Sequence, residues 1–128
     1  DLLQIDLFSG EGELFKLGAA PTYVKKGTSV QRLSGSSLPA GLSAFGQEEP
    51  PLDHFSLRLA PGDCVLMISD GVCGGEEDGW LRERLAGFDG GSPKDLAREL
   101  VTSSPQQATD DRTALVVRVE RREAQRDA

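Results

Sequence analysis

Apolar and polar residues alternate along much of the chain, which is the pattern of strands with one buried face. Turn-forming residues separate these segments, and the pattern therefore predicts antiparallel hairpins. The alternating segments are 3–7, 13–17, 23–26, 30–33 and 55–59, with a Gly27-Thr28 turn between the third and the fourth. Together they predict a protein built largely from antiparallel sheet.

The segment Cys64–Ile68 differs from these because every one of its residues is apolar. A short run of this kind, preceded by the turn residues 60–63, predicts a strand buried on both faces. It is followed by Ser69-Asp70-Gly71. An Asp-Gly pair is a common turn, and it is also a place where a carboxylate at the end of a rigid strand can bind a hard cation. The pair alone leaves both interpretations open.

Between residues 80 and 102 the spacing of apolar residues changes to that of helices. The predicted buried faces are Leu81, Leu85 and Phe88 beside Trp80 in the first helix, and Leu96, Leu100 and Val101 in the second. Ser92 and Pro93 have the features of a helix start, with serine as the cap and proline in the first turn.

The last predicted strand, Ala114–Glu120, follows the pair Asp110-Asp111. Two neighbouring carboxylates at the start of a strand repel each other, so something should compensate their charge. A bound cation, Arg112 and free solvation are all able to do so, and the pair by itself does not choose among them.

The composition is that of one globular domain: 128 residues, 38% hydrophobic and 27% charged. A formal net charge of −7 disfavours a nucleic-acid backbone as partner, and no apolar run reaches the length of a membrane span. Cys64 and Cys73 form neither a disulfide framework nor a Cys-x-x-Cys motif, and we expect Cys64 to be a core residue. His54 is the single histidine, and because the chain has no Gly-x-Ser-x-Gly elbow we do not expect Ser69-Asp70 to form a Ser-His-Asp triad.

Two polar stretches are further candidate sites. Residues 34–51 are rich in Ser, Gly and Pro and predict a long loop, which is a candidate substrate-side flap. Glu76, Glu77 and Asp78 lack the ligand spacing of an EF-hand, so a calcium-binding β-domain is a weak hypothesis and we expect this acidic loop to be solvated.

Taken together, several motifs resemble the metal-dependent serine/threonine protein phosphatases of type 2C. They are the Leu-Ala-Pro-Gly-Asp of residues 59–63, the strand ending Met-Ile-Ser-Asp-Gly at residues 67–71, and the Asp-Asp-Arg-Thr-Ala-Leu-Val-Val of residues 110–117. Residues 17–25 (LGAAPTYVK) and 38–42 (LPAGL) are most similar to the bacterial branch typified by stage II sporulation protein E.

This resemblance implies an α+β fold, part of an αββα sandwich with antiparallel β-sheets flanked by helices. Residues 1–120 would be the C-terminal part of the phosphatase domain, and residues 121–128 a charged C-terminal tail. It also implies two Mn²⁺ or Mg²⁺ ions in the complete domain, held at one rim of the sandwich. Asp70 and Gly71 match the family's metal-binding Asp-Gly motif, and Asp110 and Asp111 match its last metal motif.

The activity implied is hydrolysis of phosphoserine or phosphothreonine by water that the metal ions activate, without a covalent enzyme intermediate. The expected substrate is a phosphorylated regulatory protein of the anti-sigma-antagonist type, in bacterial sporulation and sigma-factor control. The parent protein would act in the cytoplasm, with a membrane tether elsewhere in it left open. This segment itself is expected to contact neither nucleic acid nor a membrane.

One family motif has no counterpart, because no other Asp-Gly pair precedes Asp70. We therefore expect the chain to be inactive by itself, either as the C-terminal half of a phosphatase domain or as a degenerate member. The alternative function is a non-catalytic phosphatase-fold module for binding or dimerisation, and exposed sheet edges would favour a homodimer. If the metal site is real, the carboxylates of Asp70 and Asp110 should lie about 4–6 Å apart, with Asp111 pointing away.

Overall fold

The computed structural model describes residues 1–18, 20–35, 52–73, 77–105 and 111–122, and within them the chain forms two antiparallel sheets and two helices. The strands are β1 (Leu2–Ile5), β2 (Glu11–Lys16), β3 (Thr22–Lys26), β4 (Ser29–Leu33), β5 (Asp53–Arg58), β6 (Cys64–Ile68) and β7 (Ala114–Arg118). The helices are α1 (Gly79–Ala86) and α2 (Pro93–Thr102). The α+β class predicted from the sequence is confirmed.

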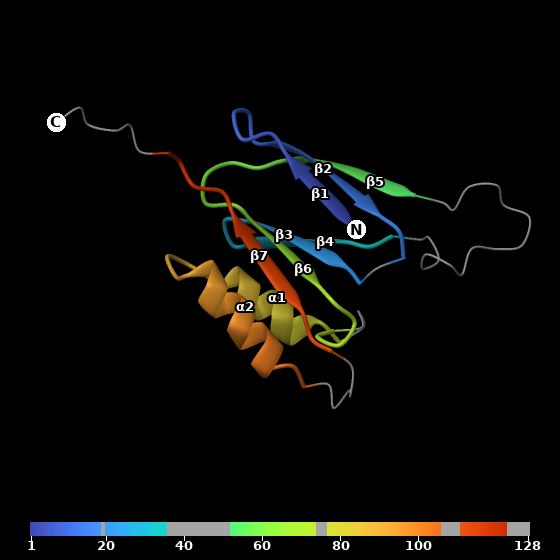
Figure 1. The fold of residues 1–128 in the computed structure, drawn as a ribbon. Coiled ribbons are helices and arrows are strands. Elements are labelled where there is room, and N and C mark those ends of the chain that lie inside the picture. Colours follow the sequence, from blue (N-terminus) through green and yellow to red (C-terminus); the bar gives the residue numbers. More distant parts are fainter. Residues whose placement is uncertain (19, 36–51, 74–76, 106–110, 123–128) are drawn as a thin grey trace, which may run out of the picture.

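The two sheets pack face to face, and both helices lie against one of them (Figure 1). One sheet has the order β1-β2-β5 and the other the order β4-β3-β6-β7. We call them the three-stranded and the four-stranded sheet. The helices cover the outer face of the four-stranded sheet, whereas no described helix covers the outer face of the three-stranded sheet. The described layers are thus sheet, sheet and helices.

Strand β6 is the central element, as its unbroken apolar run predicts. It pairs with β3 on one side and β7 on the other, with Val65 opposite both Val24 and Val117. Its residues alternate between two cores. Cys64 and Leu66 pack toward the helices, and Val65 and Met67 pack between the sheets. The burial of Cys64 confirms its prediction as a core residue.

The turn between β1 and β2 departs from the alternation that predicted it. The pattern extends the first strand to Leu7, but β1 ends at Ile5, and the side chains of Leu7 and Phe8 are 91% and 104% exposed. The Asp6 carboxylate accepts hydrogen bonds from the amides of Phe8 and Ser9 at 2.8 and 3.3 Å, which turns the chain before Leu7 can join the strand. The local aspartate turn overrides the hydrophobic period.

Helix α2 begins at the predicted Ser92-Pro93 start, whereas α1 ends at Ala86, before Phe88, which is buried but lies outside the helix that was predicted to contain it. The Ser92 hydroxyl accepts a hydrogen bond from the Asp95 amide at 3.5 Å and caps α2, whose Leu96 and Leu100 are buried. A two-pronged ion pair joins the helices, in which the Arg84 guanidinium donates to both Glu99 carboxylate oxygens at 2.7 and 2.6 Å. This pair lowers the pKa of Glu99 and raises that of Arg84.

The acidic loop before α1 is not simply solvated, which corrects our expectation for Asp78. Asp78 is buried, and its carboxylate accepts a hydrogen bond from the Tyr23 hydroxyl at 2.9 Å and lies 3.4 Å from the Arg32 guanidinium. Tyr23 is completely buried in β3. Burial raises the pKa of Tyr23, and the hydrogen bond to Asp78 raises it further. The carboxylate thus anchors the start of α1 to the sheet.

Because Tyr23 is the only tyrosine, phenolate absorbance reports on this contact alone. An unfolded tyrosine ionises near pH 10, so at about pH 11 the urea-unfolded chain should show a phenolate band and the folded chain should not. The raised pKa contributes stability below pH 10 that is lost as pH rises above it. A folded chain that titrates like free tyrosine would contradict this burial.

Candidate metal-binding site

Asp70 lies at the end of β6, beside the residues that lead into β7. The pair Ile68 and Ala114 closes the regular ladder, and the contacts continue past it. The Ser69 amide donates to the Thr113 carbonyl at 3.0 Å, and the Thr113 amide donates to the Ser69 hydroxyl at 2.9 Å. These bonds bring the Asp-Gly motif and the last acidic motif to one rim of the four-stranded sheet.

The Ser69 hydroxyl also donates to the Asp111 carbonyl at 3.2 Å. Asp70 and Asp111 are both exposed, and Gly71 is buried directly beneath the rim. Asp110 lies outside the described residues. The predicted separation of the Asp70 and Asp110 carboxylates, and the direction of Asp111, therefore remain predictions.

The end of α2 supports this rim from below. The Ser104 hydroxyl donates to the Val72 carbonyl at 2.7 Å, and the Arg112 guanidinium donates to the Val101 carbonyl at 3.2 Å. Val72 is completely buried. The backbone on both sides of the rim is thus tied to one helix end, which limits how far the two acidic motifs can separate.

The donor type at the rim suits a hard cation, since Mn²⁺ and Mg²⁺ prefer carboxylate oxygens. Within the described residues, however, no three His, Cys, Asp or Glu side chains converge on one point. Of the predicted ligands, Asp70 and Asp111 are the ones that the described residues bring to this rim.

A buried lysine near this rim was not predicted. Lys16 ends β2 with its side chain fully buried between the sheets, and its ammonium donates to the Ala20 carbonyl at 2.8 Å and the Thr22 hydroxyl at 3.1 Å. It also pairs with the Asp1 carboxylate, and Asp53 lies opposite it in β5. Burial lowers the pKa of Lys16, and the charge of Asp53 opposes that change.

The position of Lys16 in its strand could have revealed this burial. Gly12 and Leu14 precede it at alternate positions and face inward, so the period of two puts Lys16 on the same face. Since Thr22 pairs with Met67, the lysine lies toward the same end of the sandwich as Asp70. It joins the two sheets there through polar contacts, where the core between them would otherwise be apolar.

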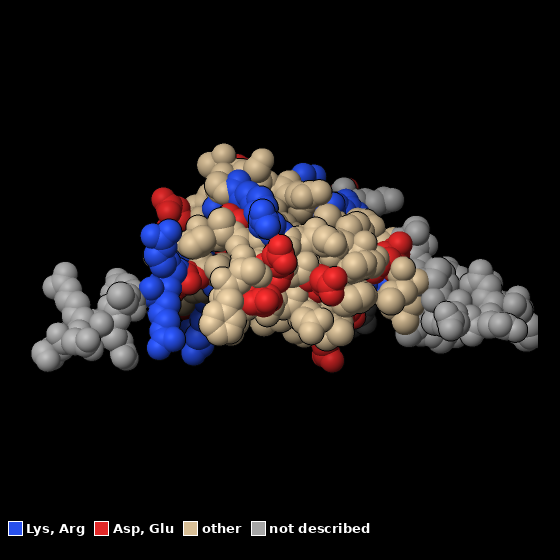
Figure 2. All heavy atoms as spheres, turned by 90° about the horizontal axis from the view of Figure 1, so that it is seen from above, with Lys and Arg blue, Asp and Glu red and all other residues tan. Residues whose placement is uncertain are grey.

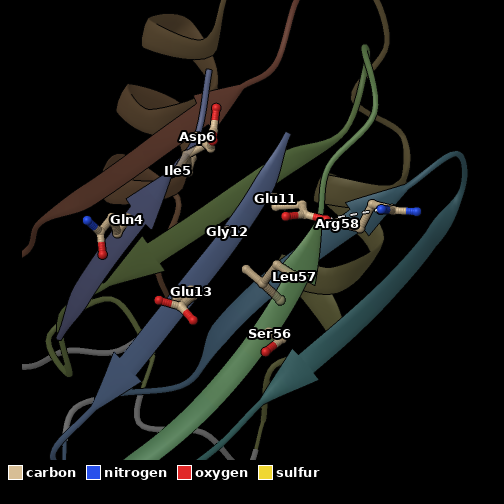
Figure 3. A pocket seen from close by; sticks show the side chains of 9 residues that line it. All are labelled: Gln4, Ile5, Asp6, Glu11, Gly12, Glu13, Ser56, Leu57 and Arg58. Atoms are coloured by element: carbon tan, nitrogen blue, oxygen red, sulfur yellow. Dashed lines mark hydrogen bonds and ion pairs between the residues drawn. The ribbon is translucent and has the colours of Figure 1, made fainter. Parts of the chain in front are cut away.

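A hollow lies elsewhere, on the outer face of the three-stranded sheet (Figure 3). It has a volume of about 780 Å³, and an ion pair at 3.1 Å between Glu11 and Arg58 crosses it. His54 lies on the same outer face, stacked on Phe15 at a ring separation of 4.7 Å. This face belongs to the other sheet from β6, so the hollow and His54 are separate from the Asp70 rim.

The family model of stage II sporulation protein E (SpoIIE) matches residues 1–120. The chain belongs to the SpoIIE family. The family resemblance seen in the sequence is confirmed, and the fold is that of part of a type 2C phosphatase domain, with two antiparallel sheets and a helical layer. None of its described helices has the length and apolar character that a membrane-spanning helix needs.

Two curated relatives and one solved structure illustrate this membership. Stage II sporulation protein E of Bacillus subtilis (strain 168) is 30% identical over 94% of this chain, and that of Priestia megaterium is 26% identical over 94%. The phosphatase domain of the cell fate determinant SpoIIE from B. subtilis, presoaked with manganese, superposes with a TM-score of 0.74 at 28% identity, covering 97% of this chain and 57% of that one. The chain spans only 15% and 21% of the two curated relatives.

The contacts of Ser69 give a direct test of how the rim is held together. Replacing Ser69 with Ala removes the acceptor of the Thr113 amide and the donor to the Asp111 carbonyl. We expect a loss of about 1–2 kcal/mol in the free energy of unfolding and faster hydrogen exchange at the Thr113 amide. Ser56→Ala, on the exposed face of β5, is the matched control and should change neither. Unchanged exchange at Thr113 in Ser69→Ala would contradict the described geometry.

Proposed function

We propose that the chain is part of a metal-dependent serine/threonine phosphatase domain in which Asp70, Asp110 and Asp111 contribute to binding Mn²⁺ or Mg²⁺. The observation that carries the proposal is the Ser69 contact, which places two acidic motifs far apart in the sequence at one rim. Two acidic motifs that meet at one strand end support a shared role in binding a hard cation.

The residues of this chain would supply ligands and shape. Asp70 offers an exposed carboxylate at the end of a strand fixed on both sides, and buried Gly71 keeps the backbone close beneath it. Bound divalent ions would supply Lewis acidity toward a phosphoryl group and a water molecule of lowered pKa. The SpoIIE family resemblance suggests as substrate a phosphorylated regulatory protein of the anti-sigma-antagonist type, in the cytoplasm of a sporulating bacterium.

A second candidate is a non-catalytic module that keeps the fold for binding or dimerisation. It is favoured by the incomplete ligand set, since the described residues gather no three metal-ligating side chains. The exposed edges that a homodimer would use are β1 and β5 in one sheet and β4 and β7 in the other. Light scattering at high concentration tests this candidate, and a strict monomer would count against it.

The decisive experiment is manganese-dependent release of phosphate by the full parent protein. Asp70→Asn should lower this activity by at least about 100-fold, because losing a shared ligand weakens the binding of the ions. Asp89→Asn, which makes the same change in an exposed loop after α1, should leave the activity unchanged. Equal activities in the two variants would end the assignment of Asp70.

The isolated chain gives a complementary test. We expect it to release no phosphate, because one metal motif of the family is missing from its sequence. Manganese should nevertheless broaden the amide resonances of Gly71 and Asp111 first, because the ion is paramagnetic and binds at this rim. Broadening that begins instead at Glu11 and Glu13 would place the ion on the three-stranded sheet and contradict the proposed site.

A further inference from the structure

The end of the molecule opposite Asp70 combines an open hollow, two exposed apolar side chains and an arginine cluster. We propose that this surface docks an acidic segment of a partner protein, one that carries an apolar side chain among its carboxylates. We call it the arginine end and define it by Leu7, Phe8, Leu59, Val119 and the arginines 121 and 122. The inference goes beyond the phosphatase proposal and does not depend on it.

The hollow is the open mouth of the core between the two sheets. It has a volume of about 350 Å³, at the lower end of the range for ligand pockets. The β1–β2 turn forms one wall, and the end of β7 with the residues after it forms the other. Leu59, Val117 and Val119 line it and belong to the inter-sheet core. An inserted apolar side chain would therefore meet core residues that already pack together.

Beside this mouth, Leu7 and Phe8 project almost fully into solvent. They do so from an ordered turn, since Asp6 binds the Phe8 amide and the Gly10 amide donates to the Asp6 carbonyl at 2.9 Å. Gly10 has φ +76°, and a Cβ there would lie 2.1 Å from the Leu59 carbonyl, so the turn is held close against the mouth. Exposed aromatic side chains on a rigid support are typical anchors of protein interfaces.

Positive charge gathers at the same place, although the whole chain carries a net charge of −7. Arg121 and Arg122 line the hollow and are exposed, and neither has an ion-pair partner within the described part of the chain. Arg118 beneath them is held by Glu120 at 2.6 Å and by the Phe88 ring. Figure 2 shows basic side chains gathered in a column at one end of the molecule, while the rest of the visible face carries both acidic and basic side chains.

The chemistry of this surface favours an acidic peptide over other polyanions. Guanidinium groups bind carboxylates through paired hydrogen bonds, and the adjacent apolar mouth adds a specificity that charge alone lacks. A nucleic acid or an anionic membrane would instead need an extended basic face, and the acidity of the remaining surface would repel it. The small concave mouth fits a side chain and not a flat surface.

Docking here would leave the candidate metal rim free. Strand β6 runs from the arginine end, where Pro61 precedes it, to the rim, where Asp70 follows it. Strand β7 pairs with β6 and runs back from the rim to the arginine end. At about 3.3 Å per strand residue the two ends are separated by roughly 15–20 Å. A partner held at one end would therefore not cover the other.

The test is fluorescence anisotropy with a labelled peptide of about 12 residues in which Asp and Glu alternate with Leu and Phe. Both this chain and the full parent protein should bind it, and salt should weaken the binding. The double variant Arg121→Glu with Arg122→Glu, and separately Phe8→Ser, should each weaken it at least about tenfold. Lys94→Glu with Arg98→Glu, which makes the same charge change on the exposed side of α2, should change it less than about twofold.

Four outcomes would overturn the proposal. The first is an equal loss of affinity in the α2 control, and the second is undiminished binding of a peptide with serine in place of Leu and Phe. The third is binding to vesicles of anionic lipid, or to single-stranded DNA, in preference to the peptide. The fourth is binding by this chain but not by the parent, since another segment of the parent would then cover the surface. Phosphate release by the parent is independent of all four.

Discussion

The structure depends most on β6, because its two faces pack into two different hydrophobic cores. Its residues alternate between the helix-packed core and the core between the sheets, and both of its edges are paired. A strand in this position cannot slip by one residue, because the shift would exchange every side chain between the two cores. Everything at its ends is consequently fixed in space, including the rim at Asp70 and the open mouth at the other end.

The sequence predicts most of this arrangement because the apolar pattern is strong where burial is complete. The run Cys64–Ile68 has no polar interruption, so both its strand character and its central place could be predicted. The Ser92-Pro93 start of α2 could be predicted for a different reason, since capping is a local interaction. The family motifs then predict a common site for Asp70 and the Asp110-Asp111 pair, which periodicity alone leaves open.

What the sequence did not predict are mainly polar side chains that become buried in the folded chain. Asp78 contacts Tyr23 and Arg32, which both lie more than forty residues away in the sequence. The local sequence around Asp78 therefore indicated a solvated acidic loop. Lys16 is buried by Thr22 and by the strands on either side of it, and a lysine at the end of a strand is usually exposed. For Leu7 the error is the opposite one, since the alternating pattern predicted a strand residue and the side chain is exposed. The hydrogen bond of the Asp6 carboxylate turns the chain before Leu7.

The magnitudes of the interactions show what fixes the rim at the end of β6. The Ser69 bonds contribute about 1 kcal/mol each, which is comparable to the repulsion between two exposed carboxylates in a high-dielectric environment. The Ser69 hydrogen bonds alone would not hold the rim in place if β6 and β7 could pair in another register. The apolar residues of β6 and its neighbours remove that choice, since burying each of these side chains contributes about 1.5–3 kcal/mol. The core therefore supplies the energy that fixes the rim, and Ser69 selects the local geometry within it. The backbone of the rim is thus ordered by the core itself, so a cation of the kind proposed would not have to order it on binding.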